Sequence, residues 1–252
     1  MGKTIVITGG ASGQGLSHAK KFAENGFNVV IGDVCSPEAL AEAKQAIVQK
    51  GAEVLALRCD VTDYAEVKNL FQAAKDTFGT VDVVIANAGI MNFGKTWELT
   101  EEQVMRMVDI HLVGTWRTCS VAAKLMLEQG GGRIINVAST AGLKAKAGII
   151  SLTKTLAKEV AKKGITVNVL CATMIESPMT RQVPFLDHIY QTSGVRYASF
   201  EEMNEQMKAK RPMGIAFLPI EPASELCYWA ATSEAARYIT GAVLPLDAGT
   251  ML

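Results

Sequence analysis

The sequence predicts an α/β fold, a doubly wound parallel sheet of about seven strands with helices on both faces. Short and nearly continuous apolar runs recur along the chain, and such runs are typical of strands covered on both faces. Longer segments with helical periodicity separate them. No linker or low-complexity tract interrupts the 252 residues, so we expect one domain, residues 1–252.

Seven segments rich in β-branched residues are the predicted strands. In chain order they are Lys3–Thr8, Asn28–Asp33, Glu53–Asp60, Val81–Asn87, Arg133–Ser139, Ile165–Cys171 and Ala242–Asp247. A helical segment between two such strands forms a βα unit. Because the crossovers of these units are right-handed, repeated units place the strands side by side and parallel.

Glycines mark the expected ends of two helices, Pro37–Gly51 and Asp63–Gly79. A further helix is expected within Phe200–Lys210. It belongs to an irregular stretch, residues 175–218, that is rich in Met, Phe and Tyr and follows the sixth strand. Long insertions after a strand often form active-site lids. We therefore expect a substrate lid at about 175–218, with an ordinary surface excursion as the alternative.

Composition limits the classes of function. Lys plus Arg and Asp plus Glu both number 25, so there is no electrostatic case for binding nucleic acid or an anionic membrane. The opening MGKTIVITGG has too few apolar residues for a signal peptide or a membrane span, and we expect a cytoplasmic protein. Five cysteines are scattered without a C-x-x-C pair, so neither a disulfide framework nor a metal site is expected.

The segment Thr8–Leu16, TGGASGQGL, is the first motif that carries chemistry. Gly9, Gly13 and Gly15 allow a tight turn close to a pyrophosphate at a helix N-terminus. Asp33 follows about twenty residues later, where a carboxylate can bind ribose hydroxyls and repel a 2′-phosphate. No Arg or Lys stands beside Asp33 in the chain, which favours NAD over NADP. A capping role for Asp33 is the alternative.

These residues resemble the short-chain dehydrogenases/reductases, in particular their NAD-dependent branch with the pattern T-G-x-x-x-G-x-G. Further segments resemble family motifs in the right order: Cys59–Asp63, Asn87–Gly89, Arg133–Gly142, Ile165–Met179 and Tyr238–Gly249. The resemblance implies a Rossmann-type fold and hydride transfer between the nicotinamide and a small-molecule alcohol or ketone. It assigns cofactor contacts to Gly9, Ser12, Gly13, Gln14, Gly15, Asp33, Asp60, Val61, Asn87, Ala88, Gly89, Lys146 and Ile175.

The resemblance also implies catalytic roles. In the family a tyrosinate takes the alcohol proton, a lysine lowers the pKa of that tyrosine and holds the nicotinamide ribose, and a serine binds the substrate oxygen. Ser139 matches the serine and Lys146 the lysine, with Lys144 as a rival. His111 stands where the family has an asparagine that holds a relay water. Its titration at about pH 6.5 would make the relay pH-sensitive. A packed histidine without a role is the alternative.

The tyrosine of the family is missing. Its position, one helical turn before the lysine, is Gly142 here, and the loop after Ser139 is short by roughly ten residues. Either the natural protein carries the tyrosine in a segment after about Lys144 that this sequence lacks, or the deletion is real. In the second case the chain is a non-catalytic NAD-binding sensor or assembly protein. Replacement by Tyr190 or Tyr197 of the lid is a further alternative.

The substrate and the assembly are inferred from the same resemblance. Apolar residues of the lid and of the segment after Asn87–Gly89 are expected to line a pocket, with core packing as the alternative: Met179, Phe185, Tyr190, Met203, Met207, Met91, Phe93 and Trp97. A bulky alicyclic, terpenoid- or steroid-like substrate would suit it. The family pairs the helices within Thr100–Gly130 and Lys146–Val160 across a two-fold axis, so a homotetramer is expected. Ala172 and Thr173 replace the Pro-Gly of the family, which weakens the assignment of Ile175.

Overall fold

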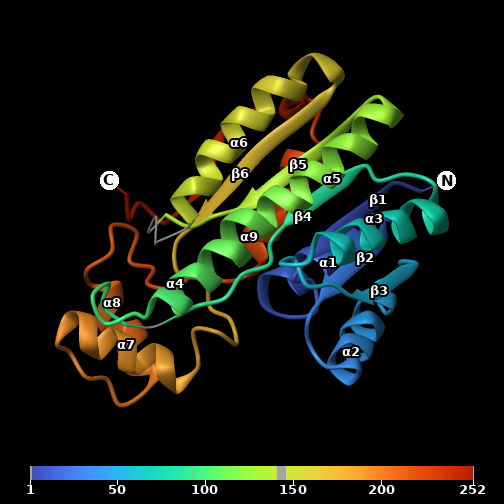
Figure 1. Cartoon of the computed structure of the whole chain (residues 1–252). Helices are drawn as coiled ribbons and strands as arrows, with labels where there is room; N and C mark the ends of the chain where they lie inside the picture. Colours follow the sequence, from blue (N-terminus) through green and yellow to red (C-terminus); the bar gives the residue numbers. More distant parts are fainter. Residues whose placement is uncertain (1, 93, 141–145, 252) are drawn as a thin grey trace.

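A seven-stranded parallel sheet, in the order β3-β2-β1-β4-β5-β6-β7, forms the centre of the protein (Figure 1). The structure is a computed structural model that describes residues 2–92, 94–140 and 146–251. The strands are β1 (Thr4–Thr8), β2 (Asn28–Asp33), β3 (Val54–Arg58), β4 (Val83–Ala86), β5 (Gly132–Val137), β6 (Ile165–Ala172) and β7 (Val243–Leu246). Every predicted strand is present, and the predicted fold class is confirmed.

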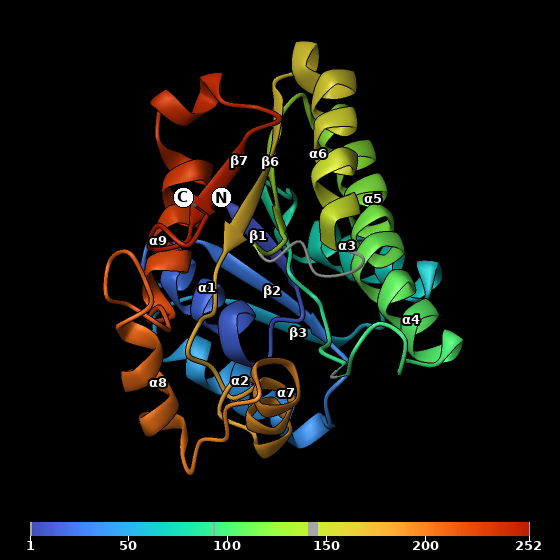
Figure 2. The ribbon, with the colours of Figure 1, turned by 90° about the vertical axis from the view of Figure 1, so that its left-hand side faces the viewer.

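Helices cover both faces of the sheet, as the view in Figure 2 shows. Successive residues of a strand enter opposite cores: Ile5 and Ile7 of β1 face one layer of helices, and Val6 faces the other. The first layer contains α1 (Gly13–Ala23), α2 (Pro37–Val48) and α9 (Glu221–Thr232). The second contains α3 (Tyr64–Phe78), α5 (Gly114–Gln129) and α6 (Lys146–Val160). Burial on both faces explains the nearly continuous apolar runs of the strands.

Local signals set the ends of the helices. Asp63 caps α3 by accepting hydrogen bonds from the N–H groups of Ala65 and Glu66, and Gly79 ends it in the left-handed conformation, φ 81°. In contrast, α2 already ends at Val48, before the expected Gly51. The helix α4 (Glu101–Val108) continues through a π-helical turn, η1 (Asp109–Val113), into α5. A π-helical turn inside a helix is frequent at functional sites.

The two ends of the predicted lid lie side by side next to the sheet. A short bridge pairs Ile175 with Leu218, with the Leu218 N–H donating to Met174 O and the Glu176 N–H donating to Leu218 O, both at 2.9 Å. Between them lie α7 (Val183–Ser193) and α8 (Phe200–Lys208). These helices and the chain after them enclose a core of their own, built on Phe185, Phe200, Met203, Ala216 and Phe217.

The lid core corrects the prediction of a pocket lined by these residues. Met203 is fully buried and Phe185 is 4% exposed, and Met207 packs against the same cluster. They hold the lid together and do not line an open pocket. Met and Phe serve equally well in both settings, so the sequence pattern does not distinguish them.

Among the described residues, no helix is long and apolar enough to cross a membrane. The five cysteines are free thiols, and Cys59, Cys119, Cys171 and Cys227 are buried while Cys35 is half-buried. Burial raises the pKa of Cys59, Cys119 and Cys227 to about 12, so these thiols are protonated at neutral pH.

Candidate active site

The predicted site residues gather along one edge of the sheet. Gly9 follows β1, Asp33 ends β2, Asp60 follows β3, Asn87 follows β4 and Ser139 follows β5. Because all the strands are parallel, their carboxyl ends lie at the same edge. Residues that are far apart in the chain therefore lie along the same edge of the sheet.

The glycine loop between β1 and α1 is packed so closely that side chains are excluded. A Cβ on Gly15 would lie 2.0 Å from the carbonyl oxygen of Gly9, and a Cβ on Gly9 would lie 2.8 Å from the Cα of Ala88. Gly9 and Gly13 both have positive φ, 66° and 50°. Nothing lies within 4 Å of a Cβ built on Gly13, so the space beside it is open.

The start of α1 fits an anionic group of a dinucleotide. Ser12 is the N-cap residue, but its side chain makes no capping hydrogen bond. The Nε2 of Gln14 is buried and has no hydrogen-bond partner. A buried donor without an acceptor is costly, and phosphate or carboxamide oxygens would satisfy both it and the helix N–H groups. The residues at this position therefore fit a nicotinamide dinucleotide.

Asn87 ties the glycine loop to β4. Its Nδ2 donates to the carbonyl oxygens of Gly9 at 2.9 Å and Thr8 at 3.2 Å, and its backbone N–H donates to Thr8 Oγ1 at 3.2 Å. The N–H of Ala88 reaches the same hydroxyl at 3.4 Å. These contacts fix the position of the glycine loop relative to the end of β4.

The Asp33 carboxylate also contacts the glycine loop. Its Oδ2 accepts from the Ala11 N–H at 2.9 Å. Its Oδ1 accepts from Val34 at 2.8 Å and from Cys35 at 3.3 Å, whereas the N-cap of α2 is Ser36. One side chain thus orders the turn after β2 and stands beside the expected dinucleotide site.

The sequence interpretation missed one cation near Asp33. The register of β2 and β3 pairs Asp33 with Arg58, so the statement that no Arg or Lys stands beside this carboxylate holds along the chain but not across the sheet. The Arg58 guanidinium binds Glu66 of α3. Hydrophobic pattern alone could not reveal a neighbour that depends on strand register.

Asp60 and Val61 build the turn after β3. Burial alone would raise the pKa of Asp60, but hydrogen bonds from Thr62 N–H and Oγ1, at 2.9 and 2.7 Å, contribute to a net lowering. Val61 is 5% exposed and sits against Gly114, where an added Cβ would come within 2.7 Å of it. Its side chain is part of the core beneath the turn.

His111 lies in the π-helical turn η1 and is 5% exposed. Its Nε2 is 2.8 Å from the carbonyl oxygen of Ile90 and donates to it in the Nε2–H tautomer, while the buried Nδ1 has no partner. Gly89 leaves room for the ring, since an added Cβ would lie 2.8 Å from His111 Cε1. Burial and then the charge of Lys146 lower the pKa of His111 to about 4. The expected titration near pH 6.5 is therefore wrong.

Lys146 is the first residue of α6 and is half-buried. The first turn of α6 packs against η1, because a Cβ on Gly148 would lie 3.0 Å from Leu112 Cδ1. Thr153 fixes the helix to β5 by accepting from Asn136 Nδ2 at 2.9 Å. Burial lowers the pKa of Lys146 to about 8, with the neighbouring Cys171 acting in the opposite direction.

Ser139 is half-buried between the ends of β5 and β6. The N–H of Ala138 donates to Leu170 O at 2.8 Å and the N–H of Thr140 to Ala172 O at 3.1 Å, which fixes the backbone on both sides of the serine. Gly142 and the rival Lys144 lie outside the described residues.

The five tyrosines of the chain have other places in the fold. Tyr64 stacks on Trp116, Tyr228 contacts Phe22, and Tyr238 is 91% exposed. The remaining two line a cavity of about 520 Å³ within the lid, together with Leu186, Asp187, Arg196, Ala198 and Glu202: these are Tyr190 and Tyr197.

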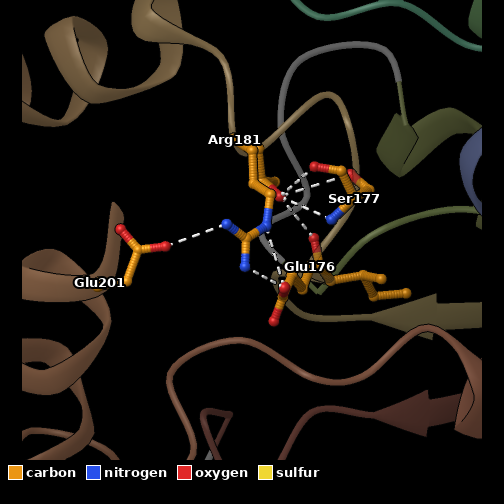
Figure 3. A network of polar contacts seen from close by, with 6 residues as sticks. Glu176, Ser177, Arg181 and Glu201 are labelled. Carbon is orange, nitrogen blue, oxygen red and sulfur yellow. Dashed lines mark hydrogen bonds and ion pairs between the residues drawn. The ribbon is translucent and has the colours of Figure 1, made fainter. Parts of the chain in front are cut away.

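Arg181 fastens the beginning of the lid to α8. Its Nε donates to Glu176 Oε1 at 3.0 Å and its Nη1 to Glu201 Oε1 at 3.1 Å, as Figure 3 shows, and its guanidinium lies 4.5 Å from the ring centroid of Phe200. The lid also touches the chain after β4, because the N–H of Gly94 donates to His188 Nδ1 at 3.4 Å. Arg181 thus holds parts of the lid together, and the contact of His188 joins the lid to the chain after β4.

Ile175, the predicted carboxamide contact, stands at the base of the lid. Its side chain is 8% exposed and packs in the core beside α9, and its carbonyl oxygen accepts from Thr180 Oγ1 at 3.0 Å. Of the other expected pocket residues, Met91 and Met179 are each 38% exposed and Trp97 is 80% exposed, while Phe93 lies outside the described residues.

Comparison with protein families places these features in a known group. Residues 3–185 match the model of the short chain dehydrogenase family. The match covers more than half of the chain, and the chain therefore belongs to this family.

Relatives extend over nearly the whole chain. An uncharacterized oxidoreductase of Mycobacterium bovis is 36% identical over 264 residues, covering 99% of this chain and 97% of its own. An uncharacterized NAD-dependent oxidoreductase of Mycobacterium tuberculosis is 32% identical over 273 residues, covering 99% and 96%. Both alignments are longer than the 252 residues of this chain. These relatives therefore contain residues that have no counterpart here.

Solved structures show the same fold at similar coverage. Carveol dehydrogenase from Mycobacterium avium, in complex with NAD, is 25% identical with a TM-score of 0.92, and the match covers 99% of this chain and 98% of that one. An actinorhodin polyketide ketoreductase with NADPH is 30% identical with a TM-score of 0.90, and the match covers 98% and 97%.

Proposed function

We propose that the protein is an NAD-dependent oxidoreductase that transfers a hydride between NAD(H) and a secondary alcohol or ketone. The observation that carries the proposal is the shared carboxyl edge of the sheet, where the glycine loop and Asp33 meet the side of the fold that bears Ser139 and Lys146. The family shown by the comparisons, with a relative described as NAD-dependent and a neighbour bound to NAD, supports it.

The residues of the site would divide the work as follows. The glycine loop and the N-terminus of α1 would bind the pyrophosphate, and Asp33 would accept hydrogen bonds from the adenosine ribose. Lys146 would hold the nicotinamide ribose, and the Ser139 hydroxyl would orient the substrate oxygen. Neutral His111 would offer its unpartnered Nδ1 to a water molecule. The nicotinamide supplies or accepts the hydride when it is bound.

The substrate that we propose is an apolar alicyclic alcohol or ketone, terpenoid- or steroid-like. The likeness to carveol dehydrogenase supports this class. Exposed apolar side chains on the lid and after β4 are available to contact such a molecule, among them Met91, Trp97 and Met179. The lid would exclude water from the reacting carbon once the substrate is bound.

One observation favours a second candidate, a non-catalytic NAD-binding sensor or assembly protein. Gly142 stands where the family has its acid-base tyrosine, and the tyrosines of the chain have other places in the fold. Without a phenol, the proton of the alcohol has no acceptor of the family's kind. The cofactor half of the site does not depend on that residue.

The intact mass of the natural protein, followed by a binding and turnover assay, separates the two candidates. We expect a mass above 27.0 kDa by about one kilodalton, an excess that peptide mapping places after Lys144, and NAD reduction with a panel of alicyclic alcohols. A mass of 27.0 kDa, together with tight NADH binding and no turnover, would establish the sensor. Failure to bind either nicotinamide cofactor would refute both candidates.

A further inference from the structure

The register of the sheet places a cation beside the carboxylate that we assign to the adenosine ribose. Arg58 is the partner of Asp33 between β2 and β3, and the N–H of Cys59 donates to Asp33 O at 2.9 Å. Paired residues of neighbouring strands point to the same face of the sheet. In dinucleotide folds an arginine near the ribose-binding carboxylate accommodates the 2′-phosphate of NADP.

The Arg58 guanidinium nevertheless binds a carboxylate from the helix layer of the other face of the sheet. Its Nη1 contacts both carboxylate oxygens of Glu66, with Oε2 at 2.6 Å. Glu66 belongs to α3, and α3 covers the face opposite to Asp33: a Cβ on Gly32, the neighbour of Asp33, would lie 2.6 Å from Leu70 of α3. Because β3 is an edge strand, the arginine can bend around it to reach Glu66.

Backbone contacts orient the Glu66 carboxylate that binds Arg58. Its Oε2 also accepts from the Asp60 N–H at 2.8 Å, and its own N–H donates to the capping Asp63 at 3.3 Å. It stands in the first turn of α3, where the helix dipole favours a negative charge. The Glu66 side chain is 32% exposed and that of Arg58 is 61% exposed, so the carboxylate is the more buried member of the pair.

We propose that Glu66 is a specificity-determining residue of the cofactor site, because it holds the Arg58 guanidinium away from the position where a 2′-phosphate would bind. The inference rests on the proposed function, and it adds a second element to the repulsion by Asp33. Discrimination against NADP then depends on two carboxylates. Asp33 repels the 2′-phosphate, and Glu66 keeps the positive charge of Arg58 away from it. An arginine can make bidentate contacts to a phosphate, so releasing Arg58 from Glu66 should raise the affinity for NADPH.

The test compares NADH and NADPH binding, measured by calorimetry without any substrate, in the native protein and in Glu66→Gln. The amide keeps an acceptor for the Asp60 N–H but frees Arg58. We expect NADPH to bind about tenfold more tightly in this variant, with NADH affinity unchanged within about twofold. Glu128→Gln is the matched control, because it removes the same charge from another ion pair of α3, that of Lys75.

Two further variants make the outcome decisive. The gain in NADPH affinity must disappear in Glu66→Gln/Arg58→Gln, and a gain that survives there would overturn the inference. Arg58→Gln alone should leave both affinities unchanged, because Arg58 does not face the phosphate in the native protein; a further loss of NADPH binding would also overturn it. If native protein binds no NADH, the proposed function fails as well. If NADH binds and Glu66→Gln behaves like Glu128→Gln, only this inference fails.

Discussion

At the scale of single residues, the surroundings given by the fold decide what a side chain can do. Two groups of the site show this. The Asp33 carboxylate is held by backbone N–H groups of the glycine loop and of its own turn, so it has a fixed direction. Burial brings the pKa of Lys146, the proposed partner of the nicotinamide ribose, to about 8. Both properties lead to measurable expectations.

Replacing Asp33 by Asn should weaken NADH binding by about tenfold, because the amide lacks the charge that strengthens hydrogen bonds to the ribose hydroxyls. Binding of NADPH should improve at the same time, since the repulsion of the 2′-phosphate is lost. Calorimetric titration of the purified variant with each cofactor checks both changes. An unchanged NADH affinity would contradict the assignment of Asp33.

Cofactor affinity should fall as the pH rises past the pKa of Lys146. Below about pH 8 the side chain is an ammonium group that can donate to the ribose, and above it the charge is lost. Between pH 7 and pH 9 we expect about a tenfold decrease in NADH affinity from this group. Lys146→Arg should flatten the profile, because a guanidinium stays charged over this range. An identical profile in that variant would exclude Lys146 as the cause.

At the scale of the elements, close packing between neighbouring segments positions the site. The strand β4 ends in a turn that leaves space for the His111 ring only because Gly89 has no side chain. The same helix layer brings the start of α6 against η1 through Gly148. These contacts join three segments that are distant in the chain.

Gly89→Ala tests this packing. The new Cβ would meet His111 Cε1 at 2.8 Å, so the ring or the turn must move. Forcing a methyl group into a packed site typically costs about 1–3 kcal/mol, and we expect a loss of this size in urea unfolding together with weaker NADH binding. Gly131→Ala is a suitable comparison, because its Cβ would have a 3.5 Å contact and space otherwise. Equal behaviour of the two variants would argue against a tight fit.

The elements also show what could be predicted from the sequence. Apolar β-branched runs located every strand, and the resemblance to the family located the helix over Lys146–Val160. These are local properties. The neighbour of Asp33 depends on the register between two strands, and the pKa of His111 depends on burial by segments outside its own helix. Whether a Phe or Met of the lid is core or pocket depends on how α7 and α8 fold over each other.

At the scale of the whole molecule, the helix layers on both faces of the sheet contribute to stability. The helix pair α1 and α9 contains a fully buried histidine, His18, whose Nδ1 is 2.9 Å from Ser224 Oγ. Burial lowers the pKa of His18 to about 3. This histidine must therefore remain neutral for the two helices to stay packed.

The linkage of His18 to folding has a definite sign. Between pH 6.5 and about 3 the unfolded chain binds a proton at this residue and the folded chain does not, so stability falls with falling pH. From pH 7 to pH 5 the loss from this group should be about 2 kcal/mol. His18→Gln should remove that part of the pH dependence in urea unfolding. A variant with the same slope as the native protein would exclude His18 as its source.

The homotetramer remains a proposal, as does a single folding unit over residues 1–252. The layer of α4 and α5 leaves large apolar side chains on its outer surface: Met105 is 56% exposed, Trp116 49% and Leu127 45%. We expect light scattering to give four times the mass of one chain. Trp116→Glu should shift the protein towards smaller species if this surface is buried between copies. An unchanged mass in that variant would place the interface elsewhere.

The lid has a consequence for how this architecture can change over time. Within the described part of the chain, a short bridge between Ile175 and Leu218 joins it to the sheet, and its aromatic core is its own. Substitutions inside it therefore disturb few contacts of the strands or of the glycine loop. A different lid could be grafted between these two residues while the cofactor end stayed intact. Substrate preference and cofactor preference would then evolve as separate, exchangeable modules of one gene.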